Sequence, residues 1–101
     1  MVSKKQFKLI NSLKKKKYRL LNQLFFAEGI KVVEELIMSD LQPYLIFCTE
    51  DYINKLSIND LVIISEKELK SISEFSTPNK IFAIFKIPEF EITNEIGRAH
   101  V

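Results

Sequence analysis

The chain has 101 residues with 47% apolar side chains, enough to fill the core of one domain, which excludes a long disordered polymer. Eight of its fifteen basic residues and none of its thirteen acidic residues lie within residues 1–19, so a +8 segment precedes a body of −6. This asymmetry favours a polyanionic partner, with nucleic acid first, because Lys and Arg that neutralise phosphates release condensed counterions.

The sequence also indicates the cellular compartment and whether the chain contacts a membrane. The single Cys48 excludes an internal disulfide and lies in an apolar run, so we expect it to pack as a small hydrophobic residue in a reducing, cytoplasmic setting. No apolar run approaches the roughly 20 residues that span a bilayer, and the N-terminus lacks the apolar stretch of a signal peptide. Residues 14–17 would occupy all sides of a helical turn, which disfavours a membrane surface as partner.

The first predicted element is a short amphipathic helix over residues 4–17. Phe7, Ile10 and Leu13 recur at a spacing of three residues and predict one buried stripe. Lysines fill the last turn, where cations interact favourably with the helix dipole.

A strand, a tight turn and a second helix come next. The bulky apolar run over residues 24–27 predicts the strand, and Glu28–Gly29 predicts the turn. Ile30, Val33 and Ile37 then recur at helical spacing and predict a buried helix face.

Three further strands are predicted by short apolar runs over residues 44–48, 61–64 and 81–85, which are typical of strands covered on both faces. Tyr52 and Leu56, one helical turn apart, predict a helix between the first two.

A helix start is predicted at Ser65. In the capping box Ser65-Glu66-Lys67-Glu68, the serine hydroxyl accepts from the Glu68 amide while the glutamate reaches back. Ile64 and Leu69 occupy the positions of a hydrophobic staple. We expect the buried stripe to continue to Phe75 and to end before Thr77–Pro78, since proline disfavours helical geometry in the preceding residue.

This alternation of helices and strands, with short connections, predicts an α/β fold. The expected architecture is a three-layer α/β/α sandwich around a four-stranded mixed sheet. We expect residues 1–88 to form the domain and residues 89–101 to be a linker toward a further domain, with a last stretch that could be a truncation scar.

Several classes of chemistry lack the residues that they need. One histidine and one cysteine cannot build a zinc site or a histidine-activated nucleophile. Two glycines, Gly29 and Gly97, cannot build a glycine-rich phosphate loop. Glu34 and Glu35 would point about 100° apart on a helix, which favours a solvated surface over paired acid and base catalysis. We therefore expect no catalytic, cofactor-binding or metal-binding residue in this chain.

Two surfaces are candidates for binding. The first is the run Lys14, Lys15, Lys16, Lys17, Tyr18 and Arg19, which combines cations with a stacking ring as RNA-binding surfaces do. Its alternative interpretation is a solvated helix end. The second is the helix start at Gly29, where the amides of Gly29, Ile30 and Lys31 would face an anion. Its alternative is an N-cap glycine without a ligand.

The order and spacing of three motifs indicate a family. Lys17-Tyr18-Arg19, Phe26-Ala27-Glu28-Gly29 and Thr77-Pro78, within residues 5–88, resemble the N-terminal substrate-binding domain of SpoU (TrmH-type) RNA 2′-O-ribose methyltransferases. One departure is the apolar pair Leu20–Leu21, where the family usually has charged or glycine-bearing residues.

The resemblance implies a fold similar to that of ribosomal proteins that bind kinked RNA. It also implies that RNA docks at the start of the helix after the first strand and on the adjacent loops. The residues that would contact RNA there are Glu28, Gly29, Lys31, Thr77 and Pro78, acting jointly with the basic run.

The resemblance also implies a division of labour. S-adenosylmethionine would be bound, and its methyl group transferred to a ribose 2′-hydroxyl, in a C-terminal knotted domain that also forms a homodimer. This chain by itself would then bind structured rRNA or tRNA without methylating it. A stand-alone RNA-binding or ribosome-associated module, and a protein-interaction module that uses the acidic body, are the alternatives.

Overall fold

The computed structural model describes residues 2–50, 61–75 and 80–88. Its elements are α1 (Lys4–Ser12), α2 (Lys16–Asn22), β1 (Leu24–Glu28), α3 (Ile30–Met38), β2 (Pro43–Cys48), β3 (Leu61–Ile63), α4 (Glu66–Ile72) and β4 (Ile81–Lys86). The strands form one mixed sheet in the order β1-β4-β2-β3. β4 is antiparallel to both of its neighbours and β2 is parallel to β3, so β1, β2 and β3 point the same way.

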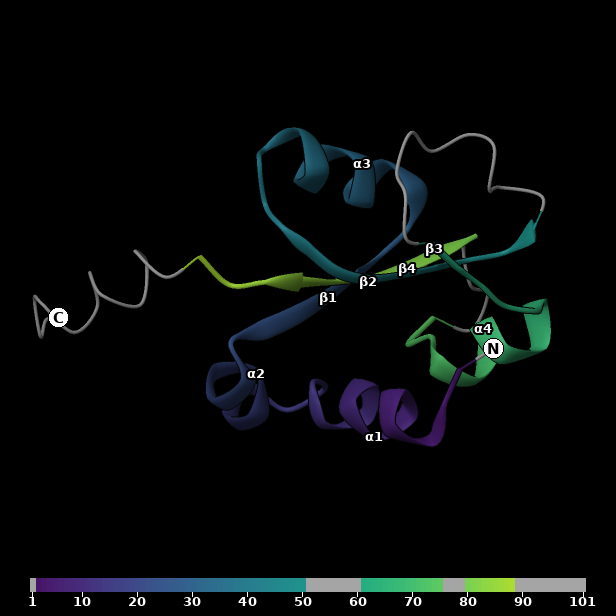
Figure 1. Cartoon of the computed structure of the whole chain (residues 1–101), viewed down its shortest axis with the longest axis horizontal. Helices are drawn as coiled ribbons and strands as arrows, with labels where there is room; N and C mark the ends of the chain where they lie inside the picture. Colours follow the sequence, from purple (N-terminus) through teal and green to yellow (C-terminus); the bar gives the residue numbers. More distant parts are fainter. Residues whose placement is uncertain (1, 51–60, 76–79, 89–101) are drawn as a thin grey trace, which may run out of the picture.

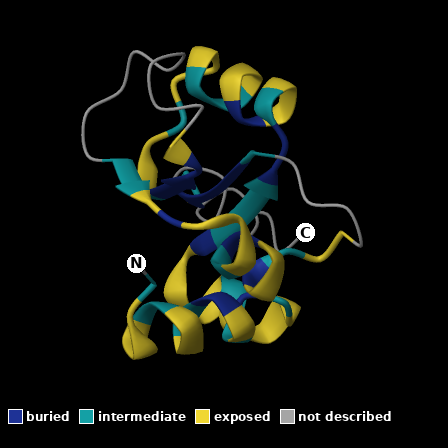
Figure 2. Ribbon diagram, turned by 90° about the vertical axis from the view of Figure 1, so that its right-hand side faces the viewer, coloured by how far each residue is buried: buried dark blue, intermediate teal, exposed yellow. Residues whose placement is uncertain are grey.

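Helices cover both faces of this sheet. Figure 1 shows α3 on one side, and α1, α2 and α4 on the other. In Figure 2 the buried strands lie between two helical layers whose outer surfaces are exposed. The predicted three-layer sandwich with a four-stranded mixed sheet is confirmed.

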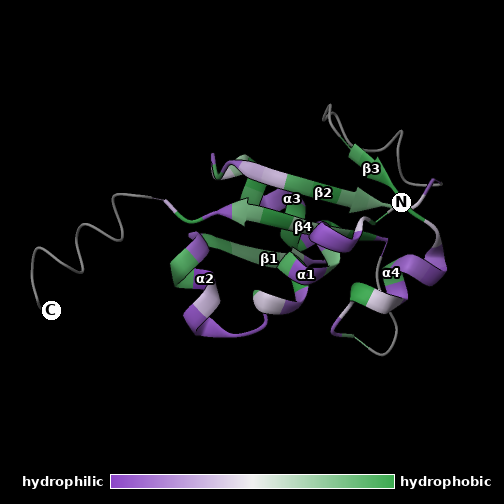
Figure 3. Ribbon diagram, turned by 60° about the horizontal axis from the view of Figure 1, so that its bottom comes forward, coloured by the Kyte–Doolittle hydropathy of each residue, from purple (hydrophilic) through white to green (hydrophobic). Residues whose placement is uncertain are grey.

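The central strand β4 explains why its sequence is a continuous apolar run. All five residues from Ile81 to Phe85 are fully buried. Phe82 and Ile84 pack with the core under α1 and α4, whereas Ala83 and Phe85 pack with the core under α3, because successive side chains point to opposite faces. Figure 3 shows the resulting contrast between apolar strands and polar outer helix faces. Cys48 is buried in the α3 core, as predicted.

The N-terminal helical region differs from the prediction of one helix over residues 4–17. α1 ends at Ser12, and α2 begins at Lys16 after a turn. Leu13 is fully buried, and its carbonyl accepts a hydrogen bond from Arg19 Nη1 at 2.9 Å. Four consecutive lysines offer no apolar stripe for α1 to continue on the sheet, so the chain turns after Leu13. The break leaves Lys15, Lys16 and Lys17 exposed to solvent.

The helix start at Ser65 is confirmed. Ser65 Oγ accepts from the Glu68 N–H at 3.1 Å, and Glu68 Oε1 accepts from the Ser65 N–H at 3.1 Å. Ile64 and Leu69 share one core cluster, as a hydrophobic staple requires. Glu68 Oε2 also accepts from the Val2 N–H at 2.9 Å, which ties the start of the chain to α4. The Val2 N–H and then the Ser65 N–H lower the pKa of Glu68, because both stabilise its carboxylate.

The other end of α4 differs from the prediction. The helix ends at Ile72, and Phe75 is half exposed, so it does not extend the buried stripe. Ser73 has an extended backbone that turns the following residues toward β1. The predicted helix around Tyr52 and Leu56 lies outside the described residues.

Candidate nucleic-acid interface

One end of the sheet gathers the glycine turn, the end of β2 and the start of β4. The Gly29 N–H donates to the Ile81 carbonyl at 3.2 Å, and the Thr49 N–H donates to the Lys80 carbonyl at 3.2 Å. Lys80 therefore enters the sheet between the turn and the end of β2. Thr77 and Pro78 lie outside the described residues, but the chain that they precede begins β4 beside Gly29.

Gly29 is required by its backbone conformation. It caps α3 at φ 102° and ψ 141°, a region that a side chain with a Cβ atom disfavours strongly. The turn is buried, and the Gly29 amide is bonded to Ile81. The expectation that this amide faces an anion is therefore wrong. Lys31, in the first turn of α3, is exposed as expected for a cation that meets a ligand.

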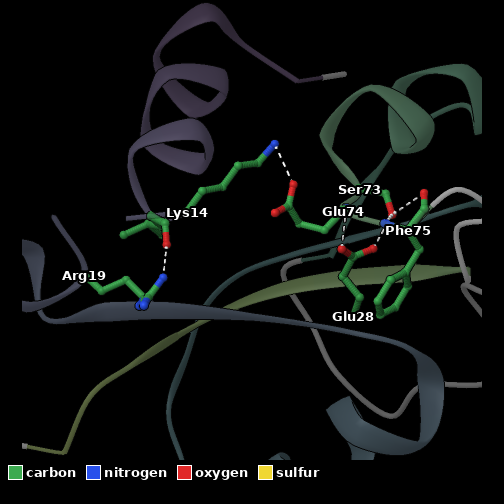
Figure 4. A network of polar contacts seen from close by, with 7 residues as sticks. Lys14, Arg19, Glu28, Ser73, Glu74 and Phe75 are labelled. Atoms are coloured by element: carbon green, nitrogen blue, oxygen red, sulfur yellow. Dashed lines mark hydrogen bonds and ion pairs between the residues drawn. The ribbon is translucent and has the colours of Figure 1, made fainter. Parts of the chain in front are cut away.

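Glu28, the last residue of β1, faces the protein. Its side chain is buried, with a relative exposure of 8% for the residue. One carboxylate oxygen accepts from the Ser73 hydroxyl, and the other accepts from the Glu74 N–H at 2.7 Å (Figure 4). Bonds from two donors to one carboxylate are charge-assisted and strong. Glu28 thus fixes the segment after α4 against the end of β1.

Lys14 lies on the far side of the same network. Its Nζ is 3.1 Å from Glu74 Oε2, and the Glu74 backbone is held by Glu28. Figure 4 shows this chain of contacts, from Lys14 through Glu74 to Glu28. It links the turn between α1 and α2 to the residue before Gly29.

The rest of the basic run has distinct surroundings. Lys17 Nζ lies 5.7 Å from the centroid of the Tyr18 ring, a cation–π distance, and Tyr18 is partly exposed. Lys15 and Lys16 are exposed as well. Arg19 is only partly exposed, because its guanidinium closes the end of α1 through the Leu13 carbonyl.

The run and the glycine turn lie toward opposite ends of β1. Lys16 and Arg19 border a hollow of about 430 Å³ together with Ile87 and Pro88, which follow β4. Leu24 pairs with Lys86 and Glu28 with Phe82, so this hollow is at the end of the sheet away from the turn. At roughly 3.3 Å per residue, the two ends of β1 lie about 13 Å apart. Among the described residues of the run, Lys14 is the one linked to the turn, through Glu74 and Glu28.

Three residues of this region were missed from the sequence. Ser73 and Glu74 reach Glu28 across separations of 45 and 46 residues, for which no local pattern exists. Lys80 begins the chain that enters β4, and its Nζ lies 3.9 Å from Glu66 Oε2 at the start of α4. Its place after Thr77–Pro78 was the one available signal.

The described residues contain no group of three His, Cys, Asp or Glu side chains placed to hold a metal ion. A hollow of about 620 Å³ beside Asn22, Tyr44 and Lys86 is open to the surface. Within the described ranges, no helix has the length and apolarity to cross a bilayer.

Solved structures define the class of this fold. The chain is similar to a TrmH-family RNA methyltransferase from Porphyromonas gingivalis, with 31% identity and a TM-score of 0.78 over 88% of this chain and 37% of that one. An AdoMet-bound rRNA methyltransferase from Sinorhizobium meliloti gives 22% identity and a TM-score of 0.68, over 87% and 36%. The SpoU methyltransferase AviRb from Streptomyces viridochromogenes, solved with AdoMet, gives 10% and 0.70, over 85% and 36%. The chain thus spans a little over a third of the length of each.

The family itself follows from the sequence. The model of the MRM3-like substrate-binding domain matches residues 4–83, so the chain belongs to this family of substrate-binding domains. No curated protein sequence matches it. The resemblance to SpoU and TrmH methyltransferases is confirmed.

Proposed function

We propose that this domain binds the RNA substrate of an S-adenosylmethionine-dependent RNA 2′-O-ribose methyltransferase. The observation that carries the proposal is the match to a substrate-binding family over residues 4–83. In this proposal the methyl group is transferred by residues outside this domain. Residues 1–88 form the binding domain, and the chain from residue 89 leads toward the methyltransferase domain.

The electrostatics of α1 and α2 support RNA as the partner. These two helices carry basic residues and no acidic one, and their lysines face solvent. Phosphates attract such a surface without any readout of sequence. Tyr18 adds a partly exposed ring on which an unpaired base can stack.

A cation beside the glycine turn extends this surface around the sheet. Lys31 is exposed in the first turn of α3, on the face of the sheet opposite α1 and α2 (Figure 1). An RNA that contacts both ends of β1 must be structured or bent, because the cations lie on two faces of the domain. We therefore propose folded rRNA or tRNA as the substrate, in the cytoplasm, with any homodimer formed through the methyltransferase domain.

The test is the salt dependence of RNA binding. The logarithm of the affinity falls linearly with the logarithm of the salt concentration. Replacing Lys15, Lys16 and Lys17 by alanine should make this slope shallower by roughly 2, since each lost phosphate contact removes about 0.7 to 0.9. Filter binding with a labelled RNA hairpin at several salt concentrations measures this slope.

The control removes two exposed cations of α4, Lys67 and Lys70, which lie outside the basic segment. For each lysine removed, the slope should change less than it does in the Lys15–Lys17 variant. Equal slopes for the wild type and the Lys15–Lys17 variant would refute the assignment of the basic run. No salt-dependent binding of RNA by the wild type would favour the protein-interaction module instead.

A further inference from the structure

The Lys14–Glu74 ion pair places an acidic side chain inside an otherwise basic region. Glu74 Oε2 lies 3.1 Å from Lys14 Nζ, with 48% of the Glu74 side chain and 29% of the Lys14 side chain exposed. Residues 1–19 contain no acidic residue, so the carboxylate reaches Lys14 from a distant part of the sequence. An exposed ion pair by itself contributes little to stability. Its position is therefore more informative than its strength.

The backbone of Glu74 is held in place. Its N–H donates to the buried carboxylate of Glu28 at 2.7 Å, and the Ser73 hydroxyl donates to the other oxygen of that carboxylate. The Glu74 side chain is thus presented to Lys14 from a fixed backbone. It can leave Lys14 by rotating about its own bonds while residues 73–75 stay in place.

We propose that the Glu74 carboxylate occupies the position on Lys14 that a phosphate oxygen of the RNA takes, and that RNA binding exchanges one for the other. This inference rests on the proposed function, because it names how one cation of the RNA surface is regulated. A lysine ammonium donates to carboxylate and phosphate oxygens alike, at similar distances. The exchange therefore needs no rearrangement of Lys14.

The place of Glu74 determines which RNA ligands the exchange affects. Glu74 lies between Lys14 and the residue that precedes Gly29, as Figure 4 shows. An RNA that runs from the exposed lysines of α2 to the glycine turn passes this carboxylate. RNA that contacts α2 alone leaves the pair intact, so Glu74 weakens short or unstructured ligands less than those that span both ends of β1.

The test compares Glu74→Gln, Lys14→Ala and the double variant with the wild type. Removing the competing carboxylate should raise the affinity for the RNA by roughly 1.4- to 5-fold, the strength of an exposed ion pair. The salt slope should stay nearly the same, because Lys14 contacts the phosphate in both proteins. The Glu74→Gln effect should disappear in the Lys14→Ala background. In the wild type, Lys14→Ala should lower the affinity less than Lys16→Ala does, because the lost phosphate contact is partly offset by the ion pair that no longer has to be broken. The probe is a labelled RNA hairpin, and circular dichroism checks that each variant is folded.

Asp40→Asn is the matched control. Asp40 is exposed at the other end of the sheet, and asparagine tolerates its positive φ of 66°. Equal gains from Glu74→Gln and Asp40→Asn would overturn the exchange, since both remove one negative charge. The exchange would also be overturned if Glu74→Gln raised the affinity for RNA equally in the Lys14→Ala background. Either of these results leaves the proposed function standing if the salt slope of RNA binding still depends on residues 15–17. A wild-type protein that binds no RNA would refute both the exchange and the proposed function.

Discussion

The buried carboxylate of Glu28 gives the sharpest test of how this site is built. The family resemblance assigns Glu28 to the RNA surface, whereas the structure turns its carboxylate toward Ser73 and Glu74. Glu28→Gln preserves the shape of the side chain but replaces one acceptor oxygen by an NH₂ donor. The Ser73 hydroxyl can rotate and accept from that donor, so the amide oxygen can still face the Glu74 N–H.

This arrangement sets how much the free energy of unfolding should fall in the Glu28→Gln variant. The substitution leaves no donor unpaired, but two hydrogen bonds to a charged carboxylate become hydrogen bonds to a neutral amide. Hydrogen bonds to charged groups contribute about 1.5–3 kcal/mol each against about 1 kcal/mol for neutral ones, so we expect the two bonds together to lose about 1–4 kcal/mol. A domain of this size is stable by only about 5–15 kcal/mol, which makes such a loss easy to measure.

The assay is urea unfolding followed by far-ultraviolet circular dichroism, beside RNA binding. Glu34→Gln, on the exposed side of α3, is the control and should change the stability by less than about 0.5 kcal/mol. We expect Glu28→Gln to lower the unfolding midpoint and to leave the salt slope of RNA binding unchanged. An unchanged midpoint combined with weaker RNA binding would refute the reasoning and place Glu28 on the RNA.

Two further predictions concern the glycine turn and the start of α4. Gly29→Ala should destabilise the fold by about 1–3 kcal/mol, because φ 102° with ψ 141° disfavours a Cβ atom; a variant as stable as the wild type in urea would contradict this. Glu68 has a lowered pKa in the folded state, so its carboxylate stabilises the fold above its ordinary pKa of 4.5, and this contribution is lost as the pH falls through the lowered value. The Glu68→Gln variant should therefore melt at a lower temperature than the wild type at neutral pH. The difference between the two melting temperatures should become smaller in acid. A difference that does not change with pH would contradict a stabilising role of the Glu68 carboxylate.

Much of the fold was predictable because its signals are local. The four apolar runs correspond to β1, β2, β3 and β4, and the run of β4 reflects a strand covered on both faces. The expectation of such cover is wrong for β3, which lies at the edge of the sheet and has no buried residue. The capping box at Ser65 depends on residues three apart, so the sequence contains both partners. Gly29 marks the one turn among the described residues where a glycine takes a positive φ. Each of these features is decided within a few residues.

The candidate site was less predictable. The basic run and the glycine turn are visible as composition, but the break between α1 and α2 depends on how Leu13 packs in the core. The early end of α4 depends on Glu28, 45 residues away from Ser73. Residue types therefore identified candidates without showing which of them face solvent.

The sequence by itself determined an α/β domain with a cationic first segment and a glycine-capped helix. The spacing of apolar residues, the helix caps and the local charge are all properties of residues that are close together in the chain. Only the tertiary structure decided that Glu28 holds the protein together, that Glu74 reaches Lys14, and that the other lysines of the run lie toward the far end of β1. Those contacts join residues that are distant in the sequence, and their geometry is set by how the helices pack on the sheet.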